Sequence, residues 1–221
     1  MPPKKPAAPR GEAVSLRTSA GRSTSQQAWL RRQLNDPYVA AARAQGYRSR
    51  AAFKLIELDD RYHVIAKGAR VVDLGAAPGG WTQVAIQRGA ASVVGVDLLP
   101  IDAIAGATLL TGDFNDEDMP ARLAELLGGK ADLVLSDMAP NTSGHAPTDH
   151  LRIMALAELA LEFATQILVP GGGFVTKLFQ GGSEKTMLTT LKQRFEKVRH
   201  AKPPASRKDS SELYVVATGF R

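Results

Sequence analysis

The sequence predicts an α/β fold in which helices cover both faces of one mostly parallel, doubly wound sheet. From residue 70 onward, short apolar runs alternate with segments of helical pattern, as expected when a helix connects successive strands. The first of these runs, at residues 71–74, is followed at once by a glycine-rich turn and then by a helical segment. The chain of 221 residues is long enough for one large domain, which we place at residues 26–221 with the sheet at 70–221.

Residues 1–25 are rich in proline, serine, alanine and basic residues, and this composition predicts a disordered tail. The basic residues of the tail outnumber its single acid, Glu12, and they are Lys4, Lys5, Arg10, Arg17 and Arg22. Such a tail either has no specific role or attracts RNA phosphates through salt-sensitive contacts.

The sequence pattern of residues 26–63 predicts helices, and we expect these helices to contact RNA. Asp36-Pro37 should interrupt the helical run, because proline disfavours a helical residue before it. Ser49 is the expected N-cap of a helix from residue 50 to about residue 62. Between residues 43 and 54 there are basic residues but no acid, and Tyr47 and Phe53 lie among them. Arginines mixed with aromatic residues favour contacts to RNA, although a solvated helix face shows the same pattern.

The remaining elements follow in regular order. The expected strands lie at residues 71–74, 92–96, 108–110, 132–136, 174–177, 197–201 and 212–218, and the expected helices at 81–88, 119–127, 151–168 and 184–195. The last two strands are joined by about ten residues, too few for a helical crossover, so the last strand should be antiparallel. Its first residue, Glu212, then lies at the edge where the parallel strands end.

The glycine-rich turn predicts a nucleotide-type pocket at the end of the first strand. Its pattern of Asp73, Gly75, Pro78, Gly79 and Gly80 differs from the G-x-G-x-x-G turn that binds a dinucleotide pyrophosphate. A carboxylate in the strand would repel a pyrophosphate, whereas it suits a cationic ligand. S-adenosylmethionine has a sulfonium and an amino group and no phosphate, so it fits better than NAD. An NAD-dependent oxidoreductase and a corner without a ligand remain alternatives.

Further acids follow the ends of neighbouring strands. Asp97 lies about 20 residues after the glycine turn, where an acid commonly binds ribose hydroxyls. Asp113 is expected to meet the adenine amino group, and Asp137 follows the fourth strand. With Asp73, these residues surround one turn, which is a stronger indication of a ligand site than any single acid.

One lysine stands out at the same edge of the sheet. Lys177 ends the fifth strand as an isolated lysine between Phe174-Val175-Thr176 and Leu178-Phe179, and a lysine in such a setting is either a general base or an edge residue that extends to water. The topology brings Asp137, Lys177 and Glu212 together. Lys54 joins them if the N-terminal helix covers the mouth of the pocket.

Composition narrows the classes of function. The net charge of +6 and the pI of about 9.7 suit a polyanionic partner. The absence of cysteine excludes disulfides, thiolate metal sites and a cysteine nucleophile. The histidines lack metal-ligand spacing, so no metal is expected. The sequence shows neither a secretory signal nor an apolar run of membrane length, and we expect a cytoplasmic protein without a membrane partner.

In these motifs the sequence resembles the FtsJ-type ribose 2′-O-methyltransferases. The matching stretches are residues 48–55, 72–81, 97–100, 112–114, 136–141, 177–181 and 211–214. The resemblance implies a Rossmann-like class I fold that depends on S-adenosylmethionine, with seven strands of which the last is antiparallel. It also implies a catalytic set of Lys54, Asp137, Lys177 and Glu212, in which Lys177 accepts the proton.

By the same resemblance, Gly79, Trp81, Asp97, Asp113 and Asp137 contact the cofactor, to which we add Asp73 and Gly75 from the turn. The expected RNA contacts are Arg48, Arg50, Lys54 and Arg207. The expected reaction is 2′-O-methylation of a uridine in 23S ribosomal RNA, on the assembled 50S subunit, by a monomer. A tRNA or other RNA substrate is one alternative, and a non-catalytic RNA-binding module is another.

Two other methylation chemistries fit less well. Carbon-5 methylation of pyrimidines needs a cysteine nucleophile, and the sequence contains none. Methylation of amino groups usually shows Asn/Asp-Pro-Pro-aromatic after the fourth strand, where this chain has Asp137-Met138-Ala139-Pro140. Residues 141–149 are either a lid over the substrate or an ordinary loop.

Overall fold

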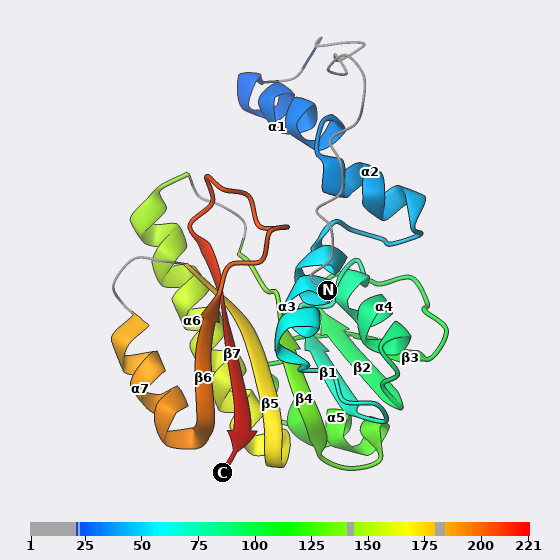
Figure 1. The fold of residues 1–221 in the computed structure, drawn as a ribbon, viewed down its shortest axis with the longest axis vertical. Coiled ribbons are helices and arrows are strands. Elements are labelled where there is room, and N and C mark those ends of the chain that lie inside the picture. Colours follow the sequence, from blue (N-terminus) through cyan, green and yellow to red (C-terminus); the bar gives the residue numbers. More distant parts are fainter. Residues whose placement is uncertain (1–20, 22, 141–143, 180–183) are drawn as a thin grey trace.

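The computed structural model describes residue 21 and residues 23–140, 144–179 and 184–221. Its centre is a seven-stranded sheet in the order β3-β2-β1-β4-β5-β7-β6, with helices on both faces (Figure 1). The strands are β1 (Arg70–Leu74), β2 (Ser92–Asp97), β3 (Ala107–Thr111), β4 (Ala131–Ser136), β5 (Leu168–Phe179), β6 (Phe195–Ala201) and β7 (Glu212–Phe220). The predicted fold class is therefore confirmed.

The helices are α1 (Thr24–Leu34), α2 (Pro37–Ala44), α3 (Ala51–Tyr62), α4 (Gly80–Gln87), α5 (Met119–Leu127), α6 (Ala146–Ile167) and α7 (Glu184–Arg194). The break between α1 and α2 falls at Asp36, which caps α2 by accepting the backbone N–H of Tyr38. The predicted tail lies mostly outside the described residues, and helix α1 already begins at Thr24, within its predicted range. Helix α6 begins five residues before the predicted start, so residues 146–149 of the suggested lid are helical, while 141–143 lie outside the described residues.

Alternating side chains of the strands build two apolar cores, one on each face of the sheet. Val72 and Leu74 of β1 face the core shared with α5, α6 and α7, whereas Val71 faces the core shared with α3 and α4. Because both faces are covered, the central strands are apolar on both sides, which explains their continuous apolar runs. The covered sheet leaves its strand ends available for a site.

Strand β7 runs antiparallel between β5 and β6. Its pairing with β5 sets Lys177 opposite Tyr214 and Phe179 opposite Glu212. Residues directly opposite in an antiparallel pair project to the same face, so Lys177 and Tyr214 are neighbours. The prediction of an antiparallel last strand is confirmed, and its insertion between β5 and β6 brings Glu212 to the end of β5.

Helix α3 covers the sheet next to α4, below α1 and α2 (Figure 1). The predicted Ser49 N-cap is wrong, because Arg50 occupies that position and its side chain makes no capping hydrogen bond. Instead, the Ser49 hydroxyl lies against Gly80 at the start of α4, where it is buried and has no hydrogen-bond partner among the residues that the structure describes. The tight approach of α3 to α4 determines the placement of Ser49.

Candidate active site

Four charged side chains from distant parts of the chain meet where β4 and β5 end. Lys54 projects from α3, Asp137 follows β4, Lys177 lies in β5, and Glu212 begins β7. The Lys177 Nζ lies 3.1 Å from Asp137 Oδ1 and donates to the Asp137 carbonyl at 2.7 Å. The Lys54 Nζ lies 2.7 Å from Glu212 Oε2 and 3.6 Å from Asp137 Oδ2. The predicted set of two lysines and two acids is therefore brought together.

Asp137 is the centre of this cluster. Burial by itself would raise the pKa of its carboxyl, but the ammonium groups of Lys177 and Lys54 and the hydroxyl of Tyr214 hold that pKa below its ordinary value. Asp137 therefore stays ionised at neutral pH. Since Lys177 is only 6% exposed, the charge of Asp137 acts on it with little screening by water.

Tyr214 belongs to the cluster, although the sequence analysis gave it no role. Its hydroxyl donates to Asp137 Oδ1 at 2.7 Å, and burial, together with the charges of Asp137 and Glu212, raises the pKa of the phenol well above its ordinary value. The phenol thus remains a hydrogen-bond donor. The sequence could have indicated this role, because Tyr214 lies two residues after Glu212 and side chains at that spacing point to the same face of a strand.

A cavity of about 600 Å³ lies beyond the ends of β1, β2 and β4. We call it the strand-end cavity. Gly75, Asp97, Asp113 and Asp137 line it together with apolar side chains, of which Leu98, Leu99 and Met138 are examples. The volume is typical of a small-molecule site. Asp97 accepts the backbone N–H of Ala77 and of Leu99, which fixes its carboxylate against the glycine turn.

The charges of the strand-end cavity select among ligands. Three carboxylates line it, and no Lys or Arg is among the described residues of its wall. The three carboxylates would repel a phosphate group, whereas they would attract a sulfonium and accept hydrogen bonds from an amino group and from ribose hydroxyls. The residues present therefore fit S-adenosylmethionine better than the pyrophosphate of a dinucleotide.

Three residues predicted to contact the cofactor do not line this cavity. Asp73 is buried beneath the turn, where it accepts the Thr82 hydroxyl at 2.7 Å, and burial raises its pKa to about 7. Gly79 has a φ of 108°, which favours glycine, and is the N-cap residue of α4. Trp81 donates its indole N–H to the Ala51 carbonyl and packs near Tyr214. All three support the turn, and their contact with a cofactor stays a prediction.

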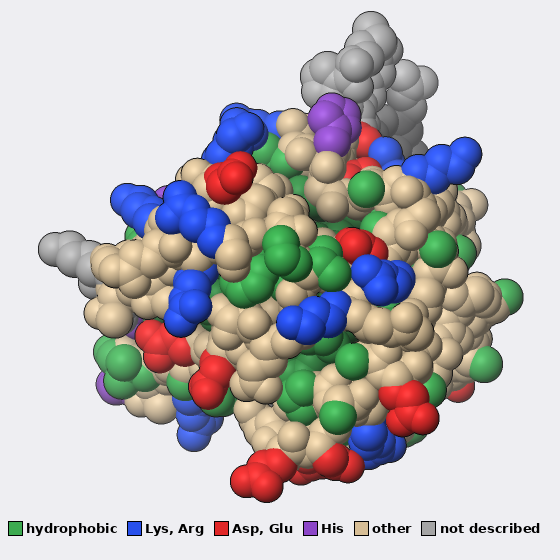
Figure 2. Space-filling model, turned by 90° about the horizontal axis from the view of Figure 1, so that it is seen from below, with side chains coloured by type: hydrophobic (Ala, Val, Ile, Leu, Met, Phe, Trp, Pro, Cys, Tyr) green, Lys and Arg blue, Asp and Glu red, His purple; other side chains and the backbone are tan. Residues whose placement is uncertain are grey.

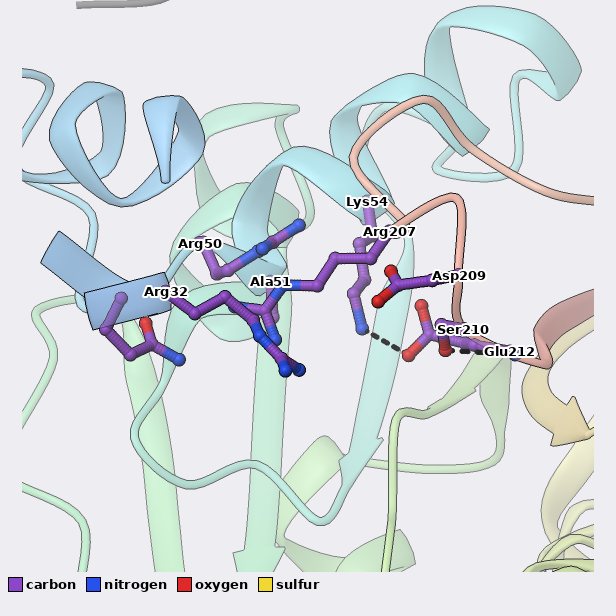
Figure 3. A pocket seen from close by; sticks show the side chains of 9 residues that line it. Arg32, Arg50, Ala51, Lys54, Arg207, Asp209, Ser210 and Glu212 are labelled. Atoms are coloured by element: carbon purple, nitrogen blue, oxygen red, sulfur yellow. Dashed lines mark hydrogen bonds and ion pairs between the residues drawn. The ribbon is translucent and has the colours of Figure 1, made fainter. Parts of the chain in front are cut away.

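A second cavity, of about 350 Å³, opens on the other side of the cluster (Figure 3). We call it the basic cavity, because Arg32, Arg50, Lys54 and Arg207 line it against two acids, Asp209 and Glu212. In Figure 3, Lys54 and Glu212 meet within it. Lys54 and Glu212 thus face the basic cavity while Asp137 faces the strand-end cavity, so the cluster lies between the two.

The predicted RNA contacts differ in how their charges are engaged. Arg50 and Arg207 line the basic cavity, and both form ion pairs with the buried Asp36. Arg48 instead donates to the backbone carbonyls of Pro78, Asp102 and Ala103. Those contacts are typical of a structural arginine that ties the loop after β2 to the glycine turn, and they give its predicted RNA contact no support.

The opposite end of the sheet has a different surface. Seen from below, where β7 ends, Lys and Arg side chains are mixed with Asp and Glu around a group of apolar side chains (Figure 2).

Within the described part of the chain, no group of three His, Asp or Glu residues is arranged to hold a metal ion. The helices described here include none long and apolar enough to cross a membrane.

Comparison with known proteins identifies the family. The model of the FtsJ-like methyltransferase family matches residues 47–220, which is more than three quarters of the chain. The chain belongs to the FtsJ-like methyltransferase family. It is therefore a methyltransferase by family, and the match includes all four residues of the charged cluster.

Relatives and a solved structure agree with this FtsJ-like assignment. The chain is 72% identical over 216 residues to the "Ribosomal RNA large subunit methyltransferase E" of Granulibacter bethesdensis, covering 98% of this chain and 94% of that protein. It is 69% identical over 212 residues to the protein of the same name from Acidiphilium cryptum, and the match covers 96% of this chain and 94% of that protein. A solved structure from Plasmodium falciparum, assigned as a ribosomal RNA methyltransferase, is 33% identical with a TM-score of 0.70, covering 79% of this chain and 98% of that one.

Proposed function

We propose that this chain transfers a methyl group from S-adenosylmethionine to the 2′-oxygen of a uridine in the 23S RNA of the large ribosomal subunit. The observation that carries the proposal is the cluster of Lys54, Asp137, Lys177 and Glu212 between an acidic cavity and a basic one. The names of the relatives support ribosomal RNA of the large subunit as the substrate.

The strand-end cavity would hold the cofactor. Asp97 and Asp113 would accept hydrogen bonds from its ribose and adenine, and Gly75 allows the close approach of the backbone that such a ligand needs. When bound, S-adenosylmethionine supplies an electrophilic methyl group on a sulfonium. The protein then has mainly to position the attacking oxygen, exclude water and accept one proton.

Lys177 would accept that proton. The cofactor, held beside Asp97 and Asp113, would supply the methyl group to the ribose 2′-oxygen and would leave as a neutral thioether. After Lys177 has lost a proton to solvent, the neutral amine at its Nζ would take the proton of the 2′-hydroxyl, and the Asp137 carboxylate at 3.1 Å would stabilise the ammonium that forms. The Tyr214 hydroxyl keeps Asp137 in place through its own hydrogen bond.

Lys54 and Glu212 would orient the ribose at the mouth of the basic cavity. Their ion pair at 2.7 Å presents both a donor and an acceptor beside Asp137. The arginines of the same cavity would bind the flanking phosphates, as planar guanidinium groups do. We further propose that the enzyme acts as a monomer on the assembled subunit, and therefore in the cytoplasm of a bacterium.

The test is the transfer of a labelled methyl group to large subunits purified from cells that lack the gene. We expect one ribose methylation in 23S RNA, mapped by resistance of the modified position to alkaline cleavage. Free 23S RNA and tRNA serve as competing substrates. Methylation of tRNA alone, or of a base rather than a ribose, would overturn the proposal.

A further inference from the structure

Glu212 is held at both oxygens of its carboxylate. Oε2 accepts from Lys54 Nζ at 2.7 Å, and Oε1 accepts from Ser206 Oγ at 2.6 Å. The Glu212 side chain is 13% exposed, so water does little to replace either donor. A carboxylate with one donor on each oxygen is constrained in rotation as well as in position, which a single ion pair cannot achieve.

Ser206 is itself fixed by the loop that carries it, residues 202–210. It is 5% exposed, and its N–H donates to the Pro203 carbonyl at 2.9 Å. The preceding residue, Ala205, donates its N–H to Glu57 Oε2 of α3 at 2.6 Å, and its carbonyl accepts from Arg50. The loop is therefore anchored to the same helix that carries Lys54, so Ser206 and Lys54 share one support.

The distances around Lys54 show what the hydrogen bond from the Ser206 hydroxyl to Glu212 controls. Lys54 Nζ is 2.7 Å from Glu212 but 3.6 Å from Asp137, while Lys177 is 3.1 Å from Asp137. Each lysine thus has a preferred carboxylate. If Glu212 could rotate away, Lys54 would move towards Asp137 and compete with Lys177 for its charge.

We propose that Ser206 is a positioning residue for methyl transfer, an inference that rests on the function proposed above. Its hydroxyl holds Glu212 so that Lys54 stays paired with Glu212 and Asp137 stays available to Lys177. Ser206 acts through Glu212 and does not touch the reacting atoms. Removal of the hydroxyl should therefore slow the chemical step and leave the binding of both substrates unchanged.

Ser206→Ala is the direct test, measured by steady-state and single-turnover methylation of purified large subunits. The loss of one hydrogen bond to a charged group lowers a rate by about tenfold when that bond supports the transition state. The kcat of Ser206→Ala should therefore fall about tenfold, while its KM for the subunit should stay within about twofold of the wild-type value. Ser206→Thr keeps a hydroxyl and should restore most of kcat. Ser211→Ala is the matched control, because Ser211 is exposed and directly follows the 202–210 loop, and its kcat should equal that of the wild type.

A crystal structure of Ser206→Ala gives a readout that does not depend on activity. We expect the Glu212 carboxylate to rotate and the distance from Lys54 Nζ to Asp137 to shorten from 3.6 Å. An unchanged kcat in the folded variant, a raised KM at unchanged kcat, or an equal loss in Ser211→Ala would overturn the inference. If the wild type fails to methylate RNA, the proposed function falls, and this distance still decides whether Ser206 positions Glu212.

Discussion

At the scale of single residues, the charge of Asp137 is shared among three donors. Lys177, Lys54 and Tyr214 all lie within 3.6 Å of its carboxylate oxygens, and the pKa of the carboxyl is low although the residue is buried. A buried charge is tolerated when it is paired in this way. The same pairing gives the proposed proton acceptor its counter-ion.

Lys177→Ala should lower the methylation rate by about a hundredfold or more, because general-base catalysis commonly contributes that much. Binding of S-adenosylmethionine, measured by calorimetry, should change by less than about twofold, since Lys177 does not line the strand-end cavity. Lys67→Ala removes an exposed lysine near the opposite end of the sheet and should behave as the wild type. A fully active Lys177→Ala would contradict the assigned role.

Asp73 should make the protein less stable as the pH rises. Burial raises its folded pKa to about 7, from an ordinary value of 3.8, so the folded state binds a proton more tightly than the unfolded state between about pH 4 and 7. The free energy of unfolding that comes from this group is therefore greatest below pH 4 and decreases as the pH rises through 7. Its magnitude is on the order of 2–4 kcal/mol.

Asp73→Asn should remove this dependence, because the amide keeps an acceptor for Thr82 and carries no charge. Urea unfolding at pH 5 and pH 8 measures the effect, and the variant should gain stability relative to the wild type at pH 8. Asp118→Asn, at an exposed position, provides the control. If the free energy of unfolding changed with pH in the same way for the wild type and Asp73→Asn, the burial of Asp73 would not make the protein less stable at high pH.

At the scale of elements, α3 organises the site by holding the 202–210 loop. Glu57 of this helix accepts from both the Tyr38 hydroxyl at 2.9 Å and the Ala205 N–H at 2.6 Å. The two donors come from α2 and from the loop, so one buried carboxylate joins three segments. A glutamine in its place would point an amide N–H₂ at one of these donors.

Glu57→Gln should therefore reduce the free energy of unfolding by about 1–3 kcal/mol, the cost of losing one buried hydrogen bond. Thermal unfolding followed by circular dichroism measures the loss. Glu125→Gln, on the exposed side of α5, should leave the melting temperature unchanged. An equally stable Glu57→Gln would show that the loop is held by its other contacts.

At the scale of the whole molecule, the basic cavity should determine how RNA binding depends on salt. Binding to RNA weakens with salt in proportion to the number of phosphates that the protein neutralises. Arg32 is exposed and lines this cavity, so Arg32→Ala should reduce the slope of log K against log salt by about one. Arg122→Ala, on the exposed side of α5, should leave the slope unchanged. An unaltered slope in Arg32→Ala would exclude this arginine from the phosphate contacts.

The sequence by itself determined the succession of strands and helices along the chain, the glycine turn and the acids at the strand ends. These features depend on residues that are close together in the chain, so local patterns and short connections are enough to predict them. The antiparallel β7 followed in the same way from the short connection after β6. The convergence of Asp137, Lys177 and Glu212 then followed from the rule that parallel strands end at one edge of a sheet.

Only the tertiary structure decided where β7 is inserted and which donors surround each carboxylate. The contact of Lys54 with Glu212 spans 158 residues and that of Tyr214 with Asp137 spans 77. The Ser49 hydroxyl, the Arg48 guanidinium and the Ser206 hydroxyl likewise have surroundings that local patterns do not encode. Such contacts depend on how distant elements pack against one another, because burial determines which polar groups must find a partner within the protein.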